Sequence, residues 1–164
     1  MAQFLKPPTP LTEIGSDPTV FLAGSIEMGV AADWQTRLSL ALESEAICIL
    51  NPRRDEWDAS WEQSISNPVF REQVEWELEA QEIADLIVMY FVPETKSPIT
   101  LLELGLFART GKLVVCCPDG FWRKGNVQIV CDRYEIKIVD TLDDLITSIR
   151  FRLLDDGREA APGR

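Results

Sequence analysis

Short apolar runs of the kind that form β-strands alternate along this chain with segments of helical character. In chains that alternate this way, consecutive strands run parallel, and the helices that connect them cover both faces of the sheet. The pattern therefore predicts a doubly wound α/β domain, flavodoxin-like or Rossmann-like, with a five-stranded parallel sheet. The expected strands are Val20–Ala23, Ile47–Leu50, Leu86–Val92, Leu113–Cys117 and Ile136–Val139, and the expected helices lie near 33–44, 69–83, 98–110, 141–154 and, more weakly, 123–131.

The length of the chain, 164 residues, suits one domain with its own hydrophobic core. Residues 1–18 are rich in proline and show little periodicity, so we expect an extended N-terminal arm there. Residues 155–164 are polar and are expected to form a disordered tail. The folded domain is then 19–154, with the wholly apolar run Leu86–Val92 as its central strand and the alternating run Ile136–Val139 at an edge.

The net charge of −11 limits the partners that such a chain attracts. An acidic surface repels the phosphates of nucleic acids and the headgroups of anionic membranes. No apolar run approaches the roughly 20 residues that a membrane-spanning helix needs. We therefore expect a soluble, cytoplasmic protein that binds neither nucleic acid nor membrane.

The chain contains no histidine. This excludes Ser-His-Asp and Cys-His relays and any metal site that uses imidazole. The four cysteines have no CxxC spacing and are interpreted as reduced, buried thiols, and no GxGxxG or Walker loop is present. We expect no metal and no cofactor, so acid–base chemistry is left to carboxylates, tyrosine, lysine, cysteine or water.

One carboxylate stands out on the expected helix near 98–110. Ser97 is a favourable N-cap residue for this helix, which then begins at the edge of the sheet where ligands bind. Helical spacing places Glu103 among Ile99, Leu106 and Phe107 on an apolar face. A carboxylate in that position needs a cavity or a partner, and the alternative is a buried structural glutamate bonded to main-chain amides.

A second carboxylate has a similar position on the helix near 69–83. Phe70, Val74 and Leu78 define the expected inward stripe, and Glu77 lies within about 20° of Phe70 on the helical wheel. Two inward carboxylates on neighbouring helices push their pKa values apart, which provides an ionised nucleophile and a proton donor. Without histidine or metal, this pairing of Glu77 with Glu103 points to glycosyl chemistry.

Three segments of the chain resemble the nucleoside 2-deoxyribosyltransferase family: Phe21-Leu22-Ala23-Gly24-Ser25-Ile26, Ala84-Asp85-Leu86-Ile87-Val88, and Ser97 through Leu102-Glu103-Leu104-Gly105. The likeness runs from about Val20 to Leu145. It implies that Glu103 is the nucleophile that forms a deoxyribosyl ester with the enzyme. It also implies that Glu77, eight residues before Asp85, contacts the nucleobase and handles its proton.

The resemblance implies further substrate contacts. Ser97, six residues before the nucleophile, takes the position that binds the sugar hydroxyls or a 5′-phosphate, in competition with its role as a helix cap. Gly24 and Ser25 are expected to line the floor of the pocket. Asn126 resembles a segment that family members donate to the site of a neighbouring subunit, so we expect a homo-oligomer with sites at subunit interfaces.

The long loop 51–68 holds the remaining candidates, and its first residues resemble a transferase-like branch of the family. We expect Asn51, Asp55 and Trp57 to contact the substrate. A tryptophan stacked on a nucleobase contributes about 1–3 kcal/mol. The alternative for Trp57, and for Trp61 in the same loop, is packing in the core.

Several positions depart from the family pattern. A tyrosine whose hydroxyl orients the nucleophile is replaced by Phe21, so another residue must hold Glu103. Relatives that hydrolyse 5′-monophosphates carry a basic residue just after Gly-Ser-Ile, whereas this chain has Glu27, which would repel a phosphate. Arg53 or Arg54 is the alternative source of positive charge.

These patterns together predict an enzyme that cleaves the N-glycosidic bond of 2′-deoxynucleosides and transfers the sugar to another nucleobase or to water. Its partners are then a small nucleoside and a free nucleobase. Two alternatives remain open. One is a 2′-deoxynucleoside 5′-monophosphate N-hydrolase, which Ser97 favours, and the other is a non-catalytic nucleotide-sensing module on the same scaffold.

Overall fold

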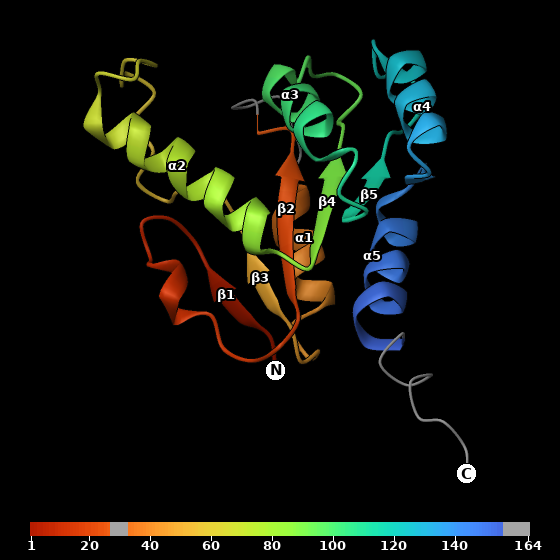
Figure 1. The fold of residues 1–164 in the computed structure, drawn as a ribbon, viewed down its shortest axis with the longest axis horizontal. Helices are drawn as coiled ribbons and strands as arrows, with labels where there is room; N and C mark the ends of the chain where they lie inside the picture. Colours follow the sequence, from red (N-terminus) through yellow and green to blue (C-terminus); the bar gives the residue numbers. More distant parts are fainter. Residues whose placement is uncertain (27–32, 156–164) are drawn as a thin grey trace.

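The computed structural model describes residues 1–26 and 33–155. Within these residues the chain forms one parallel sheet with the strand order β1-β3-β2-β4-β5-β6 (Figure 1). The predicted α/β class with an all-parallel sheet is confirmed. The strands are β1 (Gln3–Leu5), β2 (Thr19–Gly24), β3 (Cys48–Leu50), β4 (Leu86–Tyr90), β5 (Leu113–Cys116) and β6 (Lys137–Val139).

The sheet has six strands, so the prediction of five is wrong. The additional strand, β1, comes from the range 1–18 and pairs with β3, with Leu5 opposite Leu50. Its three residues are too few to show a periodic pattern, and prolines follow at once. β6 forms the opposite edge of the sheet, as its alternating sequence predicted.

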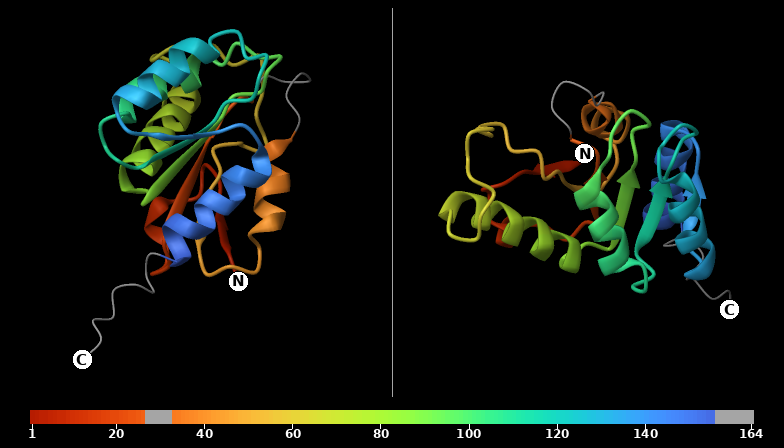
Figure 2. Two further views of the ribbon diagram at one scale, coloured as in Figure 1. Left: turned by 90° about the vertical axis from the view of Figure 1, so that its right-hand side faces the viewer. Right: turned by 90° about the horizontal axis from the view of Figure 1, so that it is seen from above.

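Helices cover both faces of the sheet (Figure 2). α2, α3 and α4 pack with β2 residues Phe21 and Ala23 on one face, and α1 and α5 pack with Val20 and Leu22 on the other. None of the helices in the described ranges is long and apolar enough to span a membrane. The helices are α1 (Trp34–Ala41), α2 (Pro68–Ile83), α3 (Pro98–Phe107), α4 (Lys124–Arg133) and α5 (Leu142–Arg150), with single turns at Leu11–Glu13 and Phe151–Asp155.

The order of strands reverses between β2 and β4. After β2 the chain adds β3 on one side, and it then returns to add β4 on the other. In doubly wound sheets, ligands bind beyond the carboxyl ends of the strands at such a point. Here those ends carry Gly24 and Ser25 after β2 and the loop to Ser97 after β4, and α3 packs against β2 beside them. The topology therefore brings two of the three family-like segments together.

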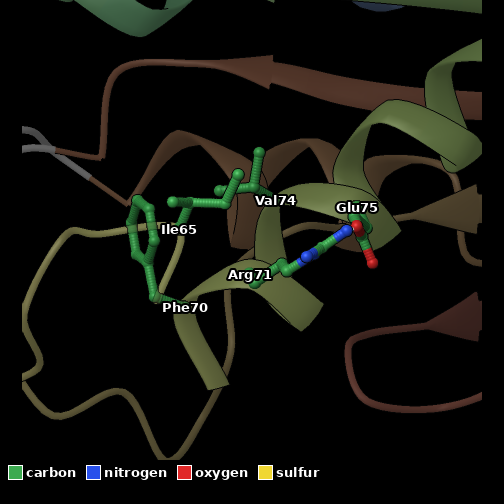
Figure 3. Close-up of a pocket in the computed structure, with 5 residues that line it drawn as sticks. All are labelled: Ile65, Phe70, Arg71, Val74 and Glu75. Atoms are coloured by element: carbon green, nitrogen blue, oxygen red, sulfur yellow. The ribbon is translucent and has the colours of Figure 1, made fainter. Parts of the chain in front are cut away.

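The buried face of α2 differs from the predicted one. Its buried residues are Gln73, Trp76, Ala80 and Gln81, whereas Leu78 is exposed and Phe70 and Val74 are half-buried. The predicted inward stripe of Phe70, Val74 and Leu78 is therefore wrong. Its first two members face the loop residue Ile65 instead of the sheet (Figure 3).

α3 buries Glu103, as predicted, but with other neighbours. Thr100, Leu104 and Phe107 share its buried face, while Ile99 and Leu106 are more than half exposed. The prediction that Ile99 and Leu106 flank it on the inward face is therefore wrong. Apolar residues lie on almost every side of this helix, so their spacing does not select a face.

The four cysteines are buried and unpaired, which confirms the interpretation from the sequence. Burial raises their pKa values, that of Cys48 to about 11. No group of three or more metal-ligating side chains gathers anywhere in residues 1–26 and 33–155.

Candidate active site

Three buried hydroxyl groups meet at the carboxyl ends of β2 and β4. Ser25 Oγ lies 2.8 Å from Thr95 Oγ1, Thr95 Oγ1 lies 2.7 Å from Ser97 Oγ, and the two serine hydroxyls are also hydrogen-bonded. The main chain fixes this cluster, because Val92 N donates to Ser25 Oγ at 3.0 Å and Thr95 Oγ1 donates to Val92 O at 2.9 Å. The structure thus joins the candidates Ser25 and Ser97 in one polar site.

Gly24 allows the close packing beneath this cluster. Its φ of 153° is rare for residues with a side chain, and a Cβ atom would lie 2.6 Å from both the Trp34 ring and the Tyr90 carbonyl oxygen. Trp34 also donates from Nε1 to the Ser25 carbonyl oxygen at 3.1 Å and meets Tyr90 edge-on. Position 24 therefore accepts glycine alone without a shift of β4 or α1.

Ser97 occupies the position before α3 without capping the helix with its side chain. Its backbone is left-handed, with φ of 48°, and its hydroxyl makes no cap bond. The interpretation of this side chain as a helix cap is therefore wrong. The hydroxyl cluster with Ser25 and Thr95 holds it in a conformation that costs a non-glycine residue about 1–2 kcal/mol.

Glu103 lies six residues after Ser97 on α3, with 8% of its surface exposed. Gln81 of α2, which is fully buried, donates from Nε2 to Glu103 Oε1 at 3.2 Å. The same Nε2 donates to the main-chain oxygen of Glu77 at 3.1 Å. The carboxylate is thus held by an amide side chain rather than by main-chain amides.

Glu77 is half-buried on the same side of α2. Gln73 donates from Nε2 to Glu77 Oε1 at 2.7 Å and to the Pro52 carbonyl oxygen at 2.8 Å. One polar row runs along α2, because Gln73, Glu77 and Gln81 lie four residues apart. This row ends at Glu103, and we call Glu77 and Glu103 the carboxylate pair.

Burial dominates the acidity of the carboxylate pair. Burial first and the negative charge of Glu77 second raise the pKa of Glu103, the bond from Gln81 lowers it, and the net value is about 8. Burial also raises the pKa of Glu77, against the bond from Gln73. The pair therefore retains a proton near neutral pH, and one carboxyl group can donate while the other is ionised.

The loop 51–67 places its candidates in other contacts. Asn51 is buried and accepts from Arg53 N at 3.0 Å, so it shapes the turn after β3. Asp55 is exposed and forms an ion pair with Lys6 at 2.7 Å. Trp57 is half-buried against Trp61, edge to face, with ring centroids 5.1 Å apart. None of these contacts, all within the described ranges, joins Asp55 or Trp57 to the carboxylate pair.

Both arginines of this loop have acidic partners. Arg53 lies 3.1 Å from Asp33, and Arg54 lies 3.3 Å from Glu72 while it covers the Trp61 ring. Glu27, the other charge considered for phosphate binding, lies outside the described residues, as do positions 156–164 of the expected tail.

Asn126 is exposed on α4. Asp85 has a structural role, because its Oδ2 accepts from both the main-chain nitrogen and the hydroxyl of Thr19 at 2.8 Å. These bonds tie the start of β4 to the start of β2, far from the hydroxyl cluster.

Sequence reasoning missed five residues that build the site. Gln73 and Gln81 stand four residues before and after Glu77, and that spacing was the available signal. Thr95, Trp34 and Tyr90 carry no such signal, because only the fold brings them to Ser25 and Gly24.

A surface pocket of about 280 Å³ lies beside α2 (Figure 3). An ion pair between Arg71 and Glu75 borders it, and its apolar side chains are Ile65, Phe70 and Val74. Neither Glu77 nor Glu103 lines it.

Comparison with known proteins gives two results. The sequence model of a family described as nucleoside 2-deoxyribosyltransferase like matches residues 17–121, a range that contains Ser25, Glu77, Ser97 and Glu103. Among solved structures, a conserved protein from Enterococcus faecalis V583 superposes with a TM-score of 0.61 at 14% identity, covering 84% of this chain and 100% of that chain. This likeness supports the fold alone, and comparison with curated protein sequences finds no significant match.

Proposed function

We propose that this chain, which belongs to the nucleoside 2-deoxyribosyltransferase-like family, transfers 2′-deoxyribose from one nucleobase to another. One observation carries the proposal: Glu103 is buried, its carboxylate accepts a hydrogen bond from the Gln81 amide, and the negative charge of Glu77 acts on it. A structural glutamate does not require a second carboxylate beside it, because two buried acids repel each other.

The pair provides both functions that cleavage of an N-glycosidic bond requires. Burial favours the neutral form of Glu103 near pH 7, so the reactive form is the one in which the shared proton lies on Glu77. In that form the Glu103 carboxylate attacks C1′ and the bond from C1′ to the base nitrogen breaks. The electron pair of that bond stays on the base, which takes the proton from Glu77. In the second half, an incoming base gives its proton to Glu77 and attacks C1′, and Glu103 leaves as a carboxylate. Water in place of the second base gives free deoxyribose.

The charges near the site favour a nucleoside over a 5′-monophosphate. Arg53 and Arg54 are already paired with Asp33 and Glu72, so a phosphate would have to compete with these carboxylates. The uncharged cluster of Ser25, Thr95 and Ser97 suits a sugar hydroxyl. The same hydroxyls also suit phosphate oxygens, which keeps monophosphate hydrolysis as the second candidate.

We further propose that the active form is a homo-oligomer. Ile99, Leu102 and Leu106 are 60%, 59% and 55% exposed and follow one side of α3. An apolar stripe of this kind marks a contact surface in soluble proteins, and a second copy would cover it. Analytical ultracentrifugation tests this: Leu102→Glu should shift the sedimentation coefficient towards the monomer, and a wild-type monomer at micromolar concentration would contradict it.

Incubation of the protein with deoxyadenosine or thymidine and a second free base tests the activity. A new deoxynucleoside, detected by chromatography, indicates transfer, whereas free base with deoxyribose indicates hydrolysis. The same assay with the 5′-monophosphates distinguishes the two substrates. Tight binding with neither product would contradict the proposal and support a nucleotide-sensing module.

A covalent trap tests the role of Glu103. A 2-fluoro-arabinosyl nucleoside should add one pentosyl group to the protein, and peptide mass spectrometry should place it on Glu103. Glu103→Gln should abolish turnover and labelling, while Glu79→Gln, an exposed acid on α2, should preserve both. Labelling at any other residue would remove Glu103 as the nucleophile.

A further inference from the structure

The buried amide of Gln81 lowers the stability of the fold. The side chain is 0% exposed, and no donor among the described residues reaches its Oε1. A buried polar atom without a partner destabilises a fold, and an apolar side chain of the same volume would avoid this cost. Stability alone therefore does not account for a glutamine at this position.

The Nε2 atom of the same amide has two partners, and both belong to residues of the carboxylate pair. Gln81 Nε2 is held by the main-chain oxygen of Glu77, which fixes the direction in which its second N–H points. That N–H reaches Glu103 Oε1. The donor thus stands on a helix that is anchored independently of α3, so it constrains the Glu103 side chain from outside its own helix.

We propose that Gln81 is the positioning residue for Glu103: it binds Oε1 and leaves Oε2 as the oxygen that attacks the sugar. The proposal rests on the proposed function for the attack itself. Phe21, on the neighbouring strand, is fully buried in the apolar core and offers no hydroxyl. The amide of Gln81 therefore provides the donor that β2 lacks at position 21.

An amide donor favours one protonation state of Glu103. It has no titratable proton, and its N–H bonds more strongly to a carboxylate than to a neutral carboxyl group. From α2, Glu77 acts on Glu103 by its charge, and from β2, Phe21 and Ala23 contribute apolar surface to this side of the sheet. Gln81 thus opposes burial and the charge of Glu77 by stabilising the ionised, nucleophilic form.

Gln73 provides an internal comparison. It holds Glu77 through Nε2 in the same way, and its Oε1 also lacks a donor within the described residues. Each member of the carboxylate pair thus has its own buried glutamine on α2. This repeated arrangement indicates that the amides serve the carboxylates rather than the packing of the helix.

The test replaces Gln81 with methionine, which keeps the volume and removes the donor. Gln81→Met should lower kcat about tenfold at pH 7 with KM within about twofold, and activity should recover as the pH rises. Removal of the unpartnered Oε1 offsets the loss of the donor to Glu103, so the unfolding midpoint should stay near that of the wild type. Gln3→Met is the matched control, because Gln3 also loses two hydrogen bonds, to Glu13 and Gly15, far from the site.

A second measurement does not depend on turnover. In protein labelled with ¹³C at the glutamate carboxyl carbons, the Glu103 resonance is assigned by its absence in Glu103→Gln. Its titration midpoint should move to higher pH in Gln81→Met and stay unchanged in Gln3→Met. Gln81→Leu serves in the same way if the methionine variant does not fold.

The outcomes separate the two proposals. A wild type that is active, with Gln81→Met showing the wild-type pH profile and Glu103 titration, would overturn the role of Gln81 and keep the proposed function. A wild type that turns over no nucleoside would overturn the proposed function. The carbon-13 titration would still decide whether Gln81 holds the carboxylate.

Discussion

The buried Glu103 makes the stability of the fold depend on pH. Its pKa is about 8 in the folded protein, against 4.5 for an unperturbed glutamate. Between these two values the unfolded chain releases the proton and the folded protein keeps it. The folded state then binds more protons, so the free energy of unfolding falls as the pH rises through this window.

The size of the effect follows from the two pKa values. A difference of about 3.5 pH units at about 1.4 kcal/mol each corresponds to about 5 kcal/mol above pH 8. Burial also raises the pKa of Glu77, and the charge of Glu77 is one cause of the raised pKa of Glu103, so this total belongs to the pair. Glu103→Gln keeps the shape and the bond from Gln81 but removes the charge, so it should be more stable than the wild type by up to about 5 kcal/mol at pH 8.5.

Urea unfolding followed by tryptophan fluorescence measures this difference. At pH 5 the wild type and Glu103→Gln should differ by less than about 1 kcal/mol, and the difference should grow steadily to pH 8.5. Glu79→Gln, at an exposed position on α2, should stay within about 0.5 kcal/mol of the wild type throughout. Parallel loss of stability in wild type and Glu103→Gln would show that Glu103 is not held neutral by burial.

Three further substitutions test other parts of the site. Gly24→Ala places a methyl group 2.6 Å from Trp34 and Tyr90, so it should lower the free energy of unfolding by more than about 2 kcal/mol, and a thermal midpoint equal to wild type would refute this packing. Thr95→Val leaves Ser25 and Ser97 without their shared partner and should cost about 1–3 kcal/mol in chemical unfolding, whereas no change would mean that the hydroxyl cluster is not stabilising. Glu77→Gln should lower kcat about 100-fold with little change in KM, and unaltered rates would exclude it as the proton carrier.

The sheet was largely predictable because its strands are apolar on both sides. Phe21 and Val20 face different cores, and both must be apolar, so the continuous run gives a clear signal. β1 was not predicted, because a strand of three residues depends on its pairing with β3 and has no pattern of its own. The proximity of Glu77 and Glu103 was also predictable, because Glu77 stands eight residues before Asp85 and Glu103 lies in the Glu-Leu-Gly segment, as in the family pattern.

The faces of the helices were not predictable in the same way. The inward face of α2 carries Gln73 and Gln81, so a rule that places apolar residues inside selects Phe70 and Val74 instead. α3 fails for the opposite reason, since its exposed side is as apolar as its buried one. Local rules fail where buried polar residues bond to one another, as the two glutamines on the core face of α2 bond to Glu77 and Glu103.

The Gln73 amide links a loop to the carboxylate pair, because its Nε2 donates to both the Pro52 carbonyl oxygen and Glu77 Oε1. Pro52 stands at the start of the tryptophan-bearing loop, so one buried side chain joins that loop to Glu77. A displacement of the loop would therefore disturb the hydrogen bond that lowers the pKa of Glu77.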